Sequence, residues 1–159
     1  MLNVNIICIG NLKEKFFSDA VSEYSKRLAR YCKFSVIELQ EEKTTDQSTS
    51  AVIEKTLSKE GERILSKIGK SDYVVAMCIE GKIISSEELS QKIEDISMHS
   101  GTVSFVIGGS WGLSDDVKKR ADMKLSVSKM TFPHQLFRVM LCEQIYRAFT
   151  ISANAKYHK

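Results

Sequence analysis

The sequence predicts a single α/β domain built on a parallel sheet of about five strands. Strand-like runs alternate with helix-like runs from one end of the chain to the other, which is the order that crossover connections between parallel strands produce. The chain has 159 residues, a length that suits one domain with a continuous core. No internal repeat and no low-complexity segment interrupts the alternation. We therefore expect one domain over residues 1–159, with one main site.

In the first half of the chain, apolar runs bounded by turn residues predict strands, and apolar side chains at helical spacing predict helices. The opening run ends at Gly10 and Asn11, which favour a turn. The stretch QEEKTTDQSTS has no apolar period and predicts a loop rather than a domain boundary. In order, the predicted elements are a strand over residues 3–10, a helix over 16–31, a strand over 33–39, a loop over 40–50 and a helix that runs through Val52 and Leu65.

In the second half, helix start signals accompany the same alternation. Ser85 or Ser86 can cap a helix whose first turn carries glutamates, and Ser114 can cap a short helix. Pro133 favours the first turn of the last helix, where a missing N–H costs nothing and the fixed φ of proline fits. In order, the predicted elements are a strand over residues 72–81, a helix over 85–98, a strand over 102–109, a helix over 113–121, a strand over 122–128 and a helix from Pro133 to Ile151.

The composition is that of an ordinary globular protein. Hydrophobic residues make up 43% of the chain and charged residues 27%, which excludes the disordered and collagen-like classes. The formal net charge of +3 permits an RNA partner without predicting one. The 4 cysteines form no CxxC pair, so we expect no metal site. The sequence has neither a signal peptide nor the roughly eighteen apolar residues of a membrane span, so we expect a cytoplasmic protein with no membrane partner.

Parallel α/β sheets bind ligands beyond the carboxyl ends of their strands, so the loops after the third, fourth and fifth strands are the candidate sites. The segment VIGGSWGL places Gly108, Gly109 and Gly112 where the backbone can turn sharply and approach a ligand. Its spacing is not the dinucleotide fingerprint GxGxxG, and the chain has no P-loop motif, which disfavours a phosphate site. A tight turn that binds nothing explains these glycines equally well. Trp111 is either an exposed anchor for a partner or a residue that packs over the loop.

The segment LSVSKMTFPHQ, before the last helix, combines serine and threonine hydroxyls with an apolar wall from Met130 and Phe132. His134 and Arg138 are four residues apart, so we expect both on the helix face that meets this segment. The positive end of the helix dipole disfavours a protonated histidine, so His134 suits the role of neutral donor, acceptor or base. Arg138 offers a planar fork for phosphate or carboxylate.

The last helix is apolar nearly all round, which predicts burial on both sides. In a small domain its own core covers one side, so we expect a second copy of the chain to cover the other, in a homodimer. A helix wrapped by its own chain is the alternative. Glu143 and Arg147 are spaced to form an ion pair in this helix. The apolar residues are Leu136, Phe137, Val139 and Met140 on one side, and Ile145, Tyr146, Ala148 and Phe149 on the other.

Four segments of the sequence resemble a known family: VIGGSWGL, LSVSKMTFPHQLFRVMLCEQIYRAF, the terminal AKYHK, and LKEKFF near the start. Over essentially its whole length the chain resembles the RlmH-type ribosomal RNA large-subunit methyltransferases of the SPOUT superfamily. It departs from their pattern at Asn11, where lysine is common, at Met77, where leucine is common, and at Trp111, where a polar residue is usual.

The resemblance implies an α/β-knot fold, a homodimer with a trefoil knot in its C-terminal half and S-adenosylmethionine held in the knot. It also implies methylation of N3 of a pseudouridine in a stem-loop of 23S rRNA, on the assembled ribosome and without a metal. Carried over by position, the implied cofactor-binding residues are Met77, Gly108, Gly109, Val127, Ser128, Lys129, Met130, Thr131 and Phe132.

The resemblance gives the terminal segment AKYHK a role in the reaction. Tyr157 and His158 are expected to close over the substrate, from the same chain or from the partner subunit, and Tyr157 can stack on an extruded base. The imide N3 must also lose its proton before it accepts a methyl group. Our hypothesis is that His134 or His158 accepts this proton and that Arg138 stabilises the negative charge that develops on the base.

Two other functions remain open on the residues alone. One is a doubly wound domain that binds a nucleotide or a flavin, which the missing fingerprint disfavours. The other is a ribosome-binding module without catalysis. Calorimetry distinguishes the methyltransferase from the ribosome-binding module. Micromolar binding of S-adenosylmethionine favours the methyltransferase, and failure to bind any cofactor favours the module.

Overall fold

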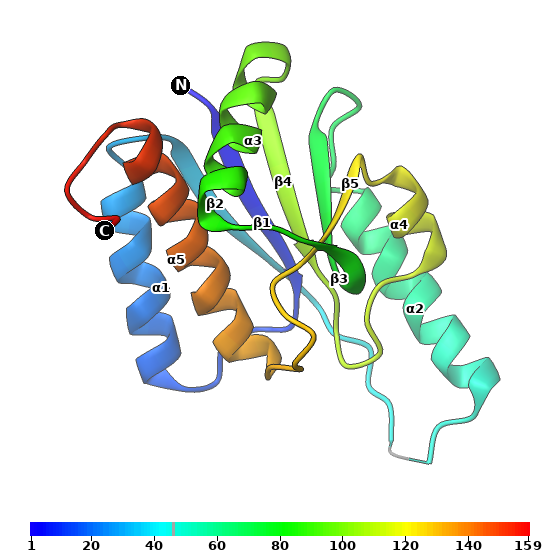
Figure 1. The fold of residues 1–159 in the computed structure, drawn as a ribbon. Helices are drawn as coiled ribbons and strands as arrows, with labels where there is room; N and C mark the ends of the chain where they lie inside the picture. Colours follow the sequence, from blue (N-terminus) through cyan, green and yellow to red (C-terminus); the bar gives the residue numbers. More distant parts are fainter. Residues whose placement is uncertain (46) are drawn as a thin grey trace.

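In the computed structural model, strands and helices alternate along the described chain, residues 1–45 and 47–159 (Figure 1). The strands are β1 (Asn3–Ile9), β2 (Lys33–Leu39), β3 (Tyr73–Ile83), β4 (Thr102–Ile107) and β5 (Met123–Ser126). The helices are α1 (Lys15–Leu28), α2 (Ser50–Leu65), α3 (Ser86–His99), α4 (Asp115–Arg120) and α5 (His134–Ser152). The alternation predicted from the sequence is confirmed. Ser85 caps α3 in a capping box with Glu88, and Ser114 caps α4.

All five strands are parallel, in the order β2-β1-β4-β3-β5. Helices connect them, because a parallel pair cannot be joined by a tight hairpin. The strands run downward in Figure 1, so their carboxyl ends share the lower edge of the sheet. We call this the carboxyl edge. The loops that leave β3, β4 and β5 there come from neighbouring strands, so they lie close together although they are far apart in sequence.

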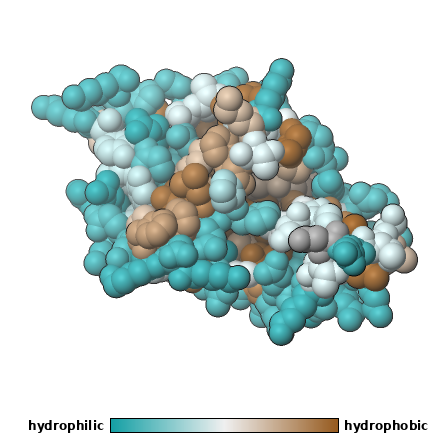
Figure 2. Space-filling view, turned by 90° about the horizontal axis from the view of Figure 1, so that it is seen from below, coloured by the Kyte–Doolittle hydropathy of each residue, from teal (hydrophilic) through white to brown (hydrophobic). Residues whose placement is uncertain are grey.

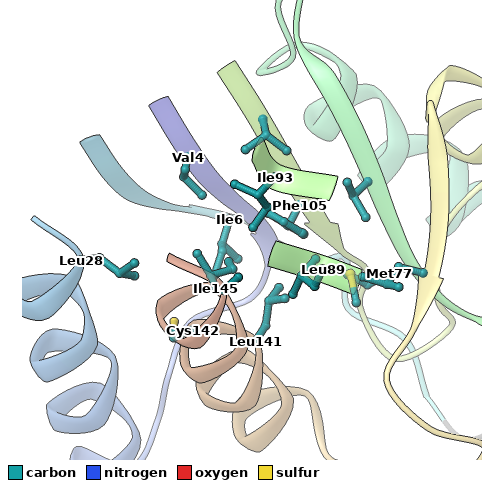
Figure 3. Close-up of a cluster of buried hydrophobic side chains, with 14 of the residues drawn as sticks. Val4, Ile6, Leu28, Met77, Leu89, Ile93, Phe105, Leu141, Cys142 and Ile145 are labelled. Atoms are coloured by element: carbon teal, nitrogen blue, oxygen red, sulfur yellow. The ribbon is translucent and has the colours of Figure 1, made fainter. Parts of the chain in front are cut away.

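Helices cover both faces of the sheet, with α1, α3 and α5 on one face and α2 and α4 on the other (Figure 1). The larger core lies under the first three helices, where Phe105 of β4 and Ile145 of α5 are fully buried (Figure 3). Burying one such side chain stabilises the fold by about 1.5–3 kcal/mol. Ile7, Val74 and Val106 anchor the second core, on the opposite face. The sheet is therefore a rigid platform for the loops at its carboxyl edge.

The cysteines of the described chain are free thiols, and three of them belong to the core. Burial raises the pKa of the Cys8 thiol to about 11 and the pKa values of Cys32 and Cys142 to about 12. These thiols stay protonated at neutral pH, and they pack as small hydrophobic groups. Cys78 differs because it is half-buried, in the middle of β3.

Strand β3 extends to Ile83, two residues beyond its predicted end, and its pairing with β5 is irregular. The register shifts between Met77 and Lys82, so the residues between them bulge out of the ladder. Gly81 permits the return to the sheet, because a Cβ there would lie 2.5 Å from the carbonyl carbon of Leu125. The bulge frees the end of β3 to line a cavity beside the sheet.

Strands β4 and β5 are shorter than predicted, because each leaves the sheet two residues early. The residues that leave, Gly108 and Gly109 after β4 and Val127 and Ser128 after β5, form the starts of two loops. Pro133 lies one position outside α5, as its N-cap with φ −57° and ψ 141°, so the prediction that it occupies the first helical turn is wrong by one residue. Its extended ψ turns the chain from the loop into the helix.

Candidate functional site

A cavity of about 400 Å³ opens at the carboxyl edge, where β3, β4 and β5 end. Met77, Ile107 and Leu125, one from each strand, give it an apolar wall. Figure 2 looks onto this edge and shows hydrophobic residues across the middle of the face, bordered by hydrophilic ones. The volume lies within the range of small-molecule sites, and the position is where parallel sheets bind ligands.

The cavity brings together most of the cofactor-binding residues that the resemblance implied. Lys129 is the exception, because its side chain is exposed and is not part of the lining. His134 and Phe137 complete the wall from the start of α5. The implied residues that line the cavity are Met77, Gly108, Gly109, Val127, Ser128, Met130, Thr131 and Phe132.

The loop after β4 is a tight turn that only glycines permit. The backbone N–H of Gly112 donates to the carbonyl of Gly109 at 3.0 Å, and Gly112 has φ +85°. A Cβ on Gly108 would lie 2.3 Å from the carbonyl oxygen of Gly112, so two backbone segments meet where no side chain fits. The loop therefore presents backbone to the cavity, which allows a ligand to approach closely.

A second loop, between β2 and α2, forms side-chain hydrogen bonds to the glycine loop that follows β4. The indole N–H of Trp111 donates to the hydroxyl of Thr44 at 3.0 Å, and the hydroxyl of Ser110 donates to a carboxylate oxygen of Glu41 at 3.3 Å. Trp111 also lines the cavity and is 39% exposed. It therefore packs over the loop, as one of its two predicted roles required, and keeps an accessible side.

Glu60 of α2 supports the glycine loop from within the protein. Its side chain is buried against Gly109, where a Cβ would lie 3.0 Å from the Oε1 atom of Glu60. The backbone N–H of Glu42 donates to the Oε2 atom at 3.0 Å. Burial raises the pKa of the Glu60 carboxyl above its ordinary value. Any side chain added at position 109 would therefore push against a buried carboxyl group.

The segment after β5 holds its shape through its own serines. The hydroxyl of Ser126 donates to the carbonyl of Ser128 at 2.9 Å, and the hydroxyl of Ser128 accepts from the backbone N–H of Met130 at 3.0 Å. Met130 is 74% exposed at the rim of the cavity. The serine hydroxyls thus build a compact turn, and an apolar side chain is left accessible at the entrance.

An ion pair that the sequence analysis missed lies in the cavity wall. Lys118 of α4 contacts Glu80 in the bulge of β3, with Nζ and Oε1 2.5 Å apart. The hydrogen bond from Lys118 lowers the pKa of the Glu80 carboxyl. Gly81 made the end of this strand look like a plain turn, so Glu80 was not singled out. The run of basic residues in α4 suggested only a solvated helix face. Neither pattern indicates that α4 lies beside the end of β3.

His134 and Arg138 do not act as a pair. His134 is exposed and lines the cavity, as expected. The Arg138 guanidinium instead reaches the ends of β1 and β2, where it donates to Glu38 at 2.6 Å and to the Gly10 carbonyl at 3.1 Å. The side chain is 3% exposed, and Arg138 is not part of the cavity lining. The expectation that Arg138 faces the substrate loop therefore needs correction: its charge is already paired on the far side of the helix.

The Arg138–Glu38 pair should stabilise the fold by holding α5 against the sheet. We expect Arg138→Met to lower the free energy of unfolding by about 2 kcal/mol. This is below the roughly 3–5 kcal/mol of a fully buried pair, because Glu38 is 43% exposed and stays hydrated when its partner is lost. Urea unfolding, followed by the fluorescence of the single tryptophan, measures the change.

The exposed pair of Lys15 and Asp19 provides the control, since its side chains are 87% and 62% exposed. Asp19→Ala should change the free energy of unfolding by less than about 0.5 kcal/mol. Equal effects of the two substitutions would contradict the anchoring role of Arg138.

The terminal residues lie at the other end of α5, away from the cavity of their own chain (Figure 1). The Tyr157 hydroxyl donates to Glu143 at 2.8 Å, and its ring lies 4.8 Å from the ring of Tyr146. His158 Nε2 lies 2.7 Å from a carboxylate oxygen of Glu87 on α3. Glu143 also pairs with Arg147 as the spacing predicted. Within one chain, the tail is ordered but does not close over the site.

A family model described as "Predicted SPOUT methyltransferase" matches residues 2–158 of this chain. The chain belongs to the SPOUT methyltransferase family. Curated relatives agree over the full length of the chain. A protein of Clostridium acetobutylicum named "Ribosomal RNA large subunit methyltransferase H" is 54% identical over 99% of this chain and 100% of its own. A relative of the same name from Leuconostoc mesenteroides is 48% identical over the same shares.

A solved structure supports the fold at low sequence identity. It is the structure of a probable methylase family protein from Haemophilus influenzae Rd KW20, with a TM-score of 0.56 and 14% identity. The match covers 99% of this chain and 71% of the other. The SPOUT fold expected from the sequence is thus confirmed, and membership disfavours the nucleotide-binding and flavin-binding alternatives.

The cavity fits the methyl donor that membership in the SPOUT methyltransferases implies. Its apolar wall suits a purine ring, and the glycine loop offers backbone N–H and C=O groups to polar atoms. Ser128 and Thr131 add hydroxyls that can donate and accept. The residues that would hold such a donor are those at the ends of β3, β4 and β5.

In residues 1–45 and 47–159, no group of three or more histidine, cysteine or acidic side chains is arranged to hold a metal ion. No helix in the same ranges is both long and apolar enough to cross a membrane.

Proposed function

We propose that this protein is an S-adenosylmethionine-dependent methyltransferase that modifies N3 of a pseudouridine in a stem-loop of 23S rRNA, in the assembled ribosome of the cytoplasm. The observation that carries the proposal is full-length identity of 48–54% to proteins named ribosomal RNA large subunit methyltransferase H. The cavity supports it, since eight residues that the sequence resemblance assigned to the cofactor line one pocket. The pseudouridine, the position N3 and the 23S stem-loop rest on the resemblance.

When bound, S-adenosylmethionine supplies a methyl group on a positively charged sulfur. The protein needs neither a metal nor a covalent bond to the substrate for this chemistry. It must hold the attacking nitrogen in line, at about 3 Å from the methyl carbon, and keep water out. Met77, Leu125 and Phe132 supply the dry wall, and the glycine loop fixes the donor by its backbone. Most of the rate therefore comes from positioning.

The target nitrogen must also lose a proton, and His134 and His158 are the two candidates to accept it. His134 lies at the cavity wall, at the first position of α5. His158 lies in the tail and reaches the site only from a partner subunit. Arg138 keeps an indirect role, since it anchors the helix that carries His134. Its pairing with Glu38 removes it from the groups that contact the base.

The site is complete only in a homodimer. A groove of about 540 Å³ runs between α3 and α5, and Val139, Met140 and Leu89 give it an apolar lining. It adjoins the cofactor cavity, because Leu125, Ser126 and Val127 line both. A second copy of the chain on this groove would bring Tyr157 and His158 to the partner's cavity. The trefoil knot is part of the same proposal. The segment after β3, Ile84 to Ser86, and the segment after β5, at Val127, lie side by side in the lining of this groove.

His134→Ala should slow methylation of ribosomes by about 100-fold in single-turnover experiments, because general-base catalysis contributes about 10²–10⁴-fold. His134→Gln keeps the size and a hydrogen bond but no base, so it should be equally slow. Met98→Ala, an exposed position far from the cavity, serves as control. If His134→Ala and His158→Ala each kept the full rate, neither residue would be the base.

Three measurements test the function itself. Calorimetry should detect micromolar binding of S-adenosylmethionine, and the purified protein should transfer its methyl group to ribosomes from a strain that lacks the gene. Mass mapping of the rRNA from that strain should show one nucleotide lighter by one methyl group. The proposal would be overturned if no methyl group were transferred from S-adenosylmethionine and if the rRNA of the strain that lacks the gene had its normal mass.

A further inference from the structure

Two aromatic side chains of the described chain belong to its exposed large hydrophobic residues, and the more exposed is Phe16 at 64%. The other is Trp111, at the glycine loop. Phe16 belongs to the first turn of α1, and neither the cofactor cavity nor the dimer groove uses it. A single exposed apolar residue needs no explanation by itself. Its position and its neighbours are what point to a partner.

Phe16 lies near the entrance of the proposed active site. The backbone N–H of Lys13 donates to the side-chain oxygen of Gln135 at 2.8 Å, which joins the β1–α1 loop to the first turn of α5. Gln135 follows His134, a residue of the cavity wall. Figure 1 shows the starts of α1 and α5 at the same lower edge of the molecule. A polymer that enters the cavity at His134 can therefore reach Phe16.

The surroundings of Phe16 combine an aromatic platform with cationic groups. The ring of Phe17 lies 4.5 Å from that of Phe16, tilted by 55°, and supports it from one side. Lys13 is exposed, and its ammonium has no ion-pair partner among the described residues. Lys15 contacts Asp19 at 2.7 Å, in a pair so exposed that it contributes little and can exchange Asp19 for another anion.

We propose that Phe16 stacks on an unpaired base of the RNA that flanks the target nucleotide, while Lys13 and Lys15 contact the neighbouring phosphates. This inference rests on the proposed function and adds a second contact to it. Single-stranded RNA is bound in this way, by aromatic rings under the bases and lysines along the backbone. A second copy of the chain is the less suitable occupant, because lysines are depleted from the cores of protein interfaces.

The test compares Phe16→Ala with Phe16→Trp in binding to ribosomes from a strain that lacks the gene. Stacking contributes about 1–3 kcal/mol per base, so Phe16→Ala should weaken binding by about tenfold or more, and Phe16→Trp should restore it. Met98→Ala is the matched control, since Met98 is 66% exposed at the opposite edge of the sheet. Lys13→Ala and Lys15→Ala should each reduce the salt dependence of binding by about 0.7 in the logarithmic slope.

Other measurements separate the possible outcomes. Binding of S-adenosylmethionine and the mass in sedimentation should be unchanged in Phe16→Ala. Unchanged ribosome affinity of Phe16→Ala would overturn the inference, and so would a loss of dimer, which would assign Phe16 to contacts between copies. Failure of the unaltered protein to methylate ribosomes would instead reject the proposed function, because the binding comparison does not depend on methyl transfer.

Discussion

Gly108→Ala should abolish binding of S-adenosylmethionine and lower the free energy of unfolding by about 3 kcal/mol. The added Cβ would lie 2.3 Å from the carbonyl oxygen of Gly112 and 2.5 Å from its carbonyl carbon. Both atoms belong to the backbone, so the clash cannot be relieved by turning a side chain. The turn must open, and its backbone groups then leave the positions that face the cavity.

Two other glycines provide the comparison. Gly101→Ala should change stability by less than about 1 kcal/mol, because no atom lies within 4 Å of the added Cβ. Gly112→Ala should fall between them, since it has open space but a φ of +85° that costs about 1–2 kcal/mol. Trp111, the only tryptophan, lines the cavity and reports both cofactor titrations and urea unfolding. Cofactor binding by Gly108→Ala at unchanged affinity would show that the glycine turn is not part of the site.

Deletion of residues 155–159 should reduce methylation by more than about 100-fold while the affinity for S-adenosylmethionine stays the same. The tail carries Tyr157 and His158, the proposed substrate contacts, but no residue of the cavity wall. Lys156→Ala changes an exposed residue of the same segment and should be active. A deletion that lost cofactor affinity would instead make the tail part of the folded core.

Mixing two inactive proteins tests which subunit supplies the tail. Chains that lack the tail keep an intact cavity, and chains with Gly108→Ala keep an intact tail. If the tail acts on the partner subunit, each mixed dimer has one site with an intact cavity and an intact tail. Activity of an equal mixture should then return to about one quarter of the normal value, because about half of the dimers are mixed. A tail that acts within its own chain would leave the mixture inactive.

The order and type of the elements could be predicted from the sequence because each has a local cause. Apolar runs of strand length, serine caps before α3 and α4, and the proline before α5 all act within a few residues. The carboxyl edge followed from the rule that parallel strands end together. The boundaries of β3, β4 and β5 were missed by two residues each, because their ends are shaped by neighbouring loops rather than by their own sequence.

The role of Arg138 and the wall formed by Glu80 and Lys118 could not be predicted, because they depend on distant contacts. Helical spacing places Arg138 near the face of His134, but a long side chain turns to the carboxylate it can reach. Glu80 meets Lys118 only because β3 bulges beside α4. In both places the partner lies on another element, and no local pattern contains that information.

The hydrogen bond from Arg138 to Glu38 joins residues that are 100 positions apart, so it cannot form until α5 has been synthesised. While the chain is being synthesised, the first two strands are made long before the helix that closes over them. Until α5 emerges, Ile6 and Phe105 lack their cover from Ile145, so the early chain exposes apolar surface and relies on late, long-range contacts. A nascent chain therefore cannot complete its core until α5 has been made, and a messenger truncated before the codons of α5 should yield insoluble protein rather than a weak enzyme.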